Sequence, residues 1–172
     1  MTSWDMIAIA AILLIGVPHG GFDGAIARRI GWSTNILSWI GFHLIYIALT
    51  MIVVILWLLF PLYSLGLFLA ISALHFGASD IADTDRHWLP WIAHGGLVSI
   101  AIPSLQPELV EPIFAILVDS TNAAVLINIV KALFIPWLLA VITYIFYAYS
   151  HNQYRKSLVN LLVLIVLVYF LA

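Results

Sequence analysis

The chain has 172 residues, of which 65% are hydrophobic and 8% are charged, and its formal net charge is −2. A soluble domain carries about 25% charged residues, so this composition predicts an integral membrane protein and lipid as its surroundings. The negative net charge excludes a nucleic-acid-binding protein. The absence of cysteine excludes disulfides, thiolate metal sites and cysteine nucleophiles.

Six apolar runs follow one another along the chain, and we expect each to form a membrane-spanning helix, since a span needs about 20 apolar residues. The runs cover residues 6–17, 35–60, 62–75, 88–102, 123–149 and 158–172. The fourth of them is expected to end before Pro103. Asp23 is expected to N-cap a short interfacial helix through Arg29 that Gly31 closes. Residues 106–120 are expected to lie along the membrane surface. The predicted fold class is all-α, a polytopic membrane helix bundle of about six spans, with residues 1–172 as a single integral membrane domain.

The charged residues predict an orientation in the cell membrane, because Lys and Arg gather in cytoplasmic loops. Basic residues fall in alternate loops, namely Arg28, Arg29, Arg86, Arg155 and Lys156. Acidic residues fall in the loops between, namely Asp5, Glu108, Glu111 and Asp119, and only Lys131 departs from this pattern. The N-terminus of this multi-pass protein is therefore predicted to lie outside. His19 and His75 then both stand at the cytoplasmic ends of their spans.

These two histidines share an unusual setting at the breaks of apolar runs. His19 opens the stretch His-Gly-Gly-Phe-Asp, which ends at Asp23, and His75 opens the stretch His-Phe-Gly-Ala-Ser-Asp, which ends at Asp80. Ionisable groups at membrane depth are usually functional, and imidazole is the commonest metal ligand. The paired motif on one side of the membrane therefore predicts that His19 and His75 form half of a metal site.

Each residue of these motifs also has a structural interpretation. His75, at the predicted end of a helix whose C′ residue would be Gly77, could complement the helix dipole. His19 could be a loop residue bonded to a carbonyl. Asp23 and Asp80 could accept hydrogen bonds from the ligating imidazoles or could cap helices. With thiolates excluded, iron, zinc and manganese all remain possible for the metal.

The other histidines are less distinctive. His94 precedes two glycines in the fourth span and could point into the same cavity, although no aspartate follows it. His43, His87 and His151 are interpreted as structural. Two histidines are too few for a strong iron or zinc site, which needs three or four protein ligands, and no His-x-x-x-His pair occurs in the chain.

Three stretches resemble the Brp/Blh family. They are Gly16 to Asp23, Ala73 to Asp80, and Gly95-Gly96-Leu97 with Ile102-Pro103. Members of this family are bacterial and archaeal membrane enzymes that cleave β-carotene centrally with O2 to give two molecules of retinal. The resemblance therefore implies an enzyme, a carotenoid-cleaving dioxygenase with β-carotene and O2 as its substrates.

The resemblance also implies a non-haem Fe(II) centre held by four histidines, with His19 and His75 as two of them. The other two ligands in the family form a His-x-x-x-His pair on a later helix, so we expect the 172 residues to be the N-terminal part of a longer enzyme. No catalytic residue is predicted beyond the metal ligands. The alternative is a non-enzymatic membrane protein, either a small transporter or a retinal-pigment assembly factor, whose histidines relay protons or contact a ligand.

Overall fold

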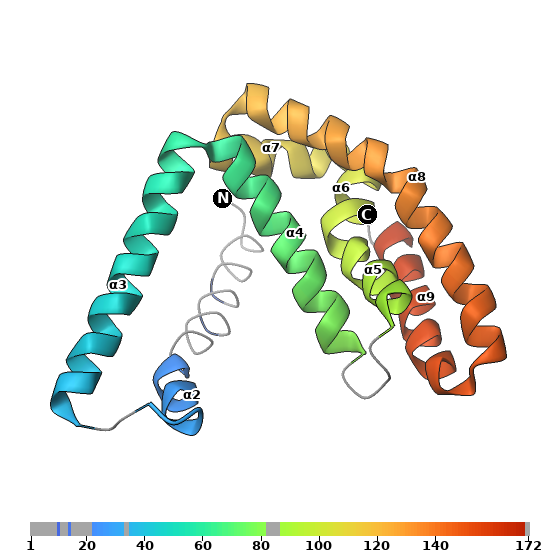
Figure 1. The fold of residues 1–172 in the computed structure, drawn as a ribbon. Helices are drawn as coiled ribbons and strands as arrows, with labels where there is room; N and C mark the ends of the chain where they lie inside the picture. The colour runs from blue at the N-terminus through green and yellow to red at the C-terminus, as the bar shows by residue number, and fades with distance from the viewer. Residues whose placement is uncertain (1–9, 11–13, 15–21, 33–34, 82–86, 171–172) are drawn as a thin grey trace. The chain divides into compact units, whose positions relative to one another are not determined.

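The fold is known from a computed structural model that describes residues 10, 14, 22–32, 35–81 and 87–170. These residues form helices joined by short connections and no β-strand, so the all-α prediction is confirmed for them (Figure 1). In chain order the helices are α2 (Asp23–Arg29), α3 (Ile36–Leu59), α4 (Pro61–Asp80), α5 (Trp88–Gly96), η1 (Leu97–Ala101), α6 (Ile102–Leu105), α7 (Pro107–Val118), α8 (Ser120–Ser150), η2 (Asn152–Tyr154) and α9 (Arg155–Phe170).

Among the described residues, five helical stretches are long and apolar enough to cross a membrane. They are Ile36–Leu59, Pro61–Ser79, Trp88–Leu105, Ser120–Ser150 and Asn152–Phe170. They correspond to the second through sixth of the predicted spans, while most of the first predicted span lies outside the described residues. The multi-pass membrane architecture is therefore confirmed.

The chain divides into two compact units, residues 1–53 and residues 54–172, with the boundary inside α3. The prediction of one integral membrane domain stays a prediction. In the first unit α2 begins at Asp23, so the prediction that Asp23 is the N-cap is wrong; Phe22 holds that position. The Asp23 carboxylate instead accepts a hydrogen bond of 2.9 Å from the Tyr46 hydroxyl. Gly31 follows α2 with φ 94°, a conformation that glycine adopts without steric cost.

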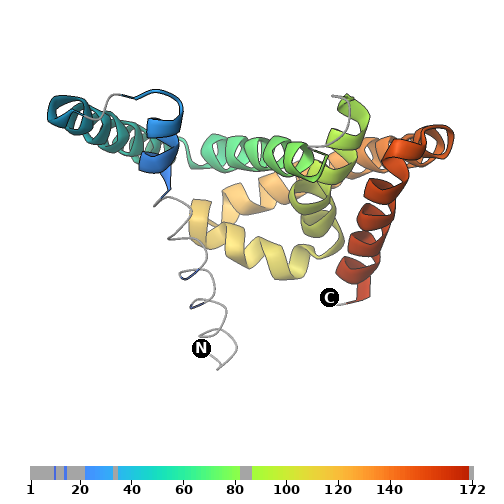
Figure 2. The same cartoon turned by 90° about the horizontal axis from the view of Figure 1, so that it is seen from below.

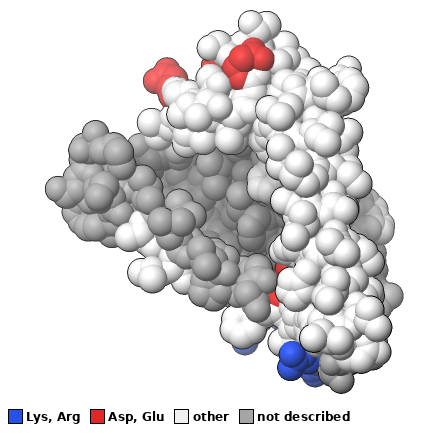
Figure 3. All heavy atoms as spheres, turned by 90° about the vertical axis from the view of Figure 1, so that its left-hand side faces the viewer, with Lys and Arg blue, Asp and Glu red and all other residues white. Residues whose placement is uncertain are grey.

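Helix α3 has no Asp, Glu, Lys or Arg anywhere along its 24 residues. Most of its large apolar side chains are exposed, from Ile36 at one end to Leu59 at the other. The described side chains on the face in Figure 3 are accordingly almost all uncharged. An exposed apolar surface of this length is what a helix presents to lipid.

In the second unit α4 and α5 run antiparallel with their backbones in close contact (Figures 1 and 2). A Cβ atom added to Gly77 would overlap the Trp91 carbonyl oxygen, and one added to Gly95 would overlap the carbonyl oxygen of Ala73. Helix association in lipid relies on such close approach, because lipid offers little hydrophobic drive between helices. Small residues at these crossings therefore set the spacing of the two helices.

The end of α4 differs from the sequence prediction. The third span was expected to stop at His75 with Gly77 just beyond it, but α4 continues to Asp80 and Ile81 is its C-cap. Gly77 is present for the close approach to α5 and not to end the helix. The apolar run breaks at His75, while the helical hydrogen bonding continues past it.

The fourth span also extends further than predicted. Residues 97–101 form a π-helical turn, and α6 carries the helix through Pro103 to Leu105. Proline has no N–H for the carbonyl four residues earlier, and its ring crowds that carbonyl, which favours a widened turn over a break. On its other side the span packs on α8, where the Trp137 indole N–H donates to the Ala93 carbonyl at 3.0 Å.

Residues 106–120, predicted as a surface-lying segment, form α7 and its connection to α8. Asp119 takes φ 76°, unusual for a residue other than glycine, and ends α7 while capping α8. The Asn122 backbone N–H donates to the Asp119 carboxylate at 3.0 Å and holds the pKa of this group below its usual value. The tight reversal lets α7 lie along α8.

The contact between α4 and α5 can be tested with two glycine substitutions. Gly95→Ala should lower the free energy of unfolding by about 1–3 kcal/mol, because the added methyl group has no space beside the Ala73 carbonyl. Gly41→Ala in α3 is the matched control, since nothing lies within 4 Å of the Cβ it adds. Thermal unfolding of both variants in detergent measures the difference, and equal stability of the two would contradict the close contact.

Candidate functional site

His75 lies on α4, five residues before the helix ends, and its side chain is exposed. The face of α4 that meets α5 carries Ala73 and Gly77. His75 is midway in sequence between Ala73 and Gly77. At 3.6 residues per turn, its side chain therefore projects about 180° around the helix from theirs. His75 therefore faces away from α5, and its ring lies edge-on to that of Phe76, with 5.7 Å between centroids.

The predicted partners of His75 are only partly within the described residues. His19 lies outside them, and so does the side chain of Asp80. Asp23 is described, and its contact is with Tyr46. Among the described residues no group of three His, Cys, Asp or Glu side chains is placed to hold a metal ion. The pairing of His19 with His75 stays a prediction.

Three other histidines have the structural contacts that we expected from the sequence. His43 Nδ1 lies 2.8 Å from the Trp39 carbonyl oxygen. The His87 ring accepts from the Leu89 N–H at the start of α5, and His151 Nδ1 lies 2.9 Å from the Tyr147 carbonyl oxygen. The rings of His87 and His151 also stack on the Tyr147 ring, at 4.5 Å and 4.2 Å between centroids.

His94 is the buried histidine of the second unit, with 3% of its surface exposed. Its Nε2 lies 3.0 Å from the Ser157 hydroxyl on α9, and its ring meets the edge of Tyr144 on α8 at 5.9 Å. A single imidazole thus contacts both α8 and α9. The sequence signal was the pair of glycines after it, of which Gly95 brings this part of α5 against α4.

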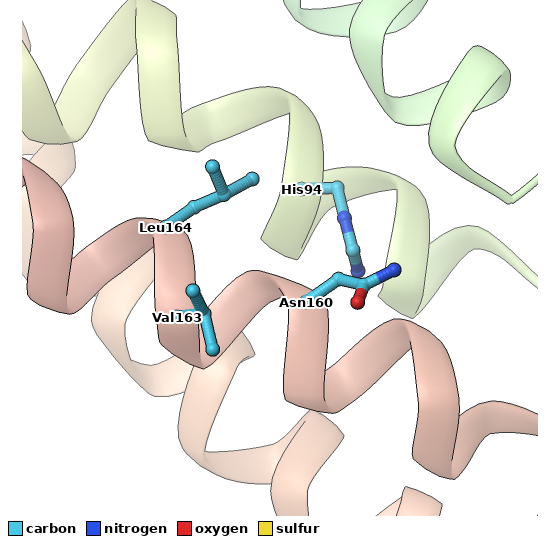
Figure 4. A pocket seen from close by; sticks show the side chains of 4 residues that line it. All are labelled: His94, Asn160, Val163 and Leu164. Carbon is cyan, nitrogen blue, oxygen red and sulfur yellow. The ribbon is translucent and has the colours of Figure 1, made fainter.

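A cavity of about 320 Å³ adjoins this histidine and is lined by His94, Asn160, Val163 and Leu164. Figure 4 shows the imidazole pointing from α5 towards α9, with the Asn160 carboxamide beside its tip. Val163 and Leu164 form the apolar part of the wall. Polar groups and apolar surface are therefore combined in one site within the spanning helices.

A second cavity of about 320 Å³ lies beside the contact of α4 and α5 and is almost entirely apolar. Its walls are two tryptophan rings together with small and aliphatic side chains: Ala73, Leu74, Trp88, Trp91, Ile92, Gly96 and Ile100. Volumes of about 300–1,000 Å³ and apolar, aromatic walls are typical of small-molecule sites.

Stability distinguishes the two candidate histidines. His75→Ala should leave the unfolding temperature nearly unchanged, because the side chain is exposed and faces away from α5. His94→Ala should cost about 2–4 kcal/mol, because it removes a buried hydrogen bond and leaves a void. Thermal unfolding in detergent measures both, and equal losses would contradict the placement of His75 on the open face.

Comparison with known proteins identifies the family of this chain. A family model described as Beta-carotene 15,15'-dioxygenase matches residues 10–172. A protein named Beta-carotene 15,15'-dioxygenase, from uncultured marine bacterium 66A03, is 32% identical over 154 residues, which cover 88% of this chain and 56% of that relative. The chain thus spans little more than half the length of this relative, and no solved structure matches it. The expected resemblance is confirmed: the chain belongs to the beta-carotene 15,15'-dioxygenase family.

Proposed function

We propose that this protein cleaves β-carotene with O2 at the central double bond and releases two molecules of retinal. The family match over residues 10–172 carries the proposal. It favours an enzyme over the alternative of a transporter or assembly factor, because the relative is named for a dioxygenase. Carotenoid cleavage in a membrane also suits a chain whose helices expose apolar side chains along their whole length.

The apolar cavity beside α4 and α5 supports a hydrocarbon substrate. Its walls offer two indole rings and aliphatic groups, and such surfaces bind a hydrocarbon through many dispersion contacts with the chain that fills the cavity. One ring-bearing end of a carotenoid is the kind of group that this cavity suits. Orientation would then come from the shape of the cavity, since a hydrocarbon forms no hydrogen bonds.

We further propose that His75 and His19 are ligands of an Fe(II) ion. His75 suits this role because its imidazole is exposed on the face of α4 turned away from α5. The described residues provide one imidazole at this place and do not complete a coordination sphere. When bound, iron would supply the activation of O2, while α4 fixes the position of one ligand.

The proposal predicts retinal formation in cells. Expression of the complete reading frame in bacteria that accumulate β-carotene should bleach the cells and yield retinal on chromatography. His75→Ala should lower the yield by at least about 100-fold, since losing even an outer partner of a metal ligand costs about 10–100-fold. His151→Ala is the control, because it removes an exposed imidazole that contacts Tyr147 and is not a proposed iron ligand. Retinal yield in the His75 variant equal to wild type would remove this residue from the site.

The same charge pattern that predicted an external N-terminus leads us to propose cytoplasmic positions for Arg28 and Arg155. Arg28 lies in the last turn of α2, and its guanidinium lies 4.7 Å from the centre of the Trp39 ring. Arg155 begins α9. Glu108, in the first turn of α7, would then lie outside.

Cysteine labelling tests this orientation, since the chain has no cysteine of its own. Arg28→Cys and Arg155→Cys should be protected from a membrane-impermeant thiol reagent added to intact cells, and Glu108→Cys should react. All three should react after the cells are permeabilised. Protection at position 108 with labelling at position 28 would invert the orientation.

A further inference from the structure

His94 has no role in the proposed cleavage, yet it is held in the middle of a membrane-spanning segment. Burial of a polar side chain in an apolar interior is costly unless hydrogen bonds compensate for it. The Ser157 hydroxyl at 3.0 Å supplies one such bond. The imidazole also borders a cavity, and the Asn160 side chain from α9 lines that cavity beside the imidazole (Figure 4).

The chemistry of this cavity limits what it can bind. The carboxamide of Asn160 is uncharged and both donates and accepts hydrogen bonds. The four described residues that line the cavity include no acidic or basic side chain apart from the imidazole. Val163 and Leu164 bring apolar surface to the remainder of the wall. This combination suits a molecule that is apolar except for one uncharged oxygen.

We propose that the cavity between α5 and α9 binds the hydroxyl or carbonyl oxygen at one end of an isoprenoid, with Asn160 as its main hydrogen-bonding partner. The isoprenoid part of this inference rests on the proposed function, and the oxygen part rests on the residues of the cavity. Two sources share this chemistry. One is the aldehyde of retinal, and the other is the ring hydroxyl of an oxygenated carotenoid.

Asn160 can be changed without disturbing the core, because its side chain is exposed to the cavity and the surroundings. Asn160→Leu removes the carboxamide and keeps a side chain of similar size. Asn152→Leu makes the same chemical change at an exposed position in η2, outside the lining of the cavity. The comparison of these two variants isolates the cavity from the general effect of added apolar surface.

The test is ligand binding to the protein in lipid nanodiscs, followed by quenching of tryptophan fluorescence and corrected with empty nanodiscs. Each oxygenated probe is paired with its hydrocarbon. All-trans-retinal is compared with the analogue that has a methyl group in place of the aldehyde, and ring-hydroxylated β-carotene is compared with β-carotene. In one pair the oxygenated member should bind about tenfold more tightly than its hydrocarbon, which is the effect of one good hydrogen bond. That pair shows whether the bound oxygen is the aldehyde of retinal or the hydroxyl of an oxygenated carotenoid.

The ratio of the two dissociation constants within that pair should fall close to one in Asn160→Leu and stay near tenfold in Asn152→Leu. Equal binding within both pairs, or a ratio that survives in Asn160→Leu, would overturn the inference and leave the His94–Ser157 contact as a purely structural one. Binding does not require turnover. A protein that shows the ratio but forms no retinal would therefore refute the proposed function and leave the oxygen site in place.

Discussion

The close approach of α4 and α5 is the interaction on which the second unit depends. Gly77 and Gly95 let the two backbones meet at the carbonyl groups of Trp91 and Ala73. This crossing fixes the rotation of α4 and thereby turns His75 to the opposite face. The same crossing places α5 where Gly96 can meet the Trp137 ring of α8. The glycines at this crossing thus determine the direction in which the histidine side chains point.

The two histidines of interest differ because of this arrangement. His75 lies on a face that α5 leaves open, and the opposite side of the crossing has the apolar cavity with its two tryptophans. His94 is enclosed by α8 and α9, with its imidazole bonded to Ser157. An exposed imidazole is available to a ligand from outside its own helix, whereas an enclosed one organises its neighbours and the small cavity beside them.

The sequence predicted the all-helical membrane architecture well, because long apolar runs in a chain with few charges have few other stable arrangements. Helix ends were harder to predict. Gly77 suggested a helix end at His75, but glycine also serves close packing, and composition does not separate the two uses. Pro103 suggested another end, but a π-helical turn carries the span past it.

The importance of His94 was also underestimated from the sequence. Ser157, which bonds to its imidazole, and Asn160, which lines the same cavity, lie more than sixty positions further along the chain. Their proximity to His94 depends on how α9 folds back along α8. No local pattern contains that information. The His-x-Gly motif of His75 was visible locally, and the family match agrees with the resemblance drawn from it.

The proposal that His75 ligates iron in a carotene-cleaving enzyme is tested most directly by iron X-ray absorption spectroscopy on the purified protein from its complete reading frame. The expected result is one iron per chain with nitrogen ligands at the distances of imidazole coordination, and loss of one such ligand or of the iron in His75→Ala. An unchanged iron content and an unchanged coordination shell in that variant would contradict the assignment of His75.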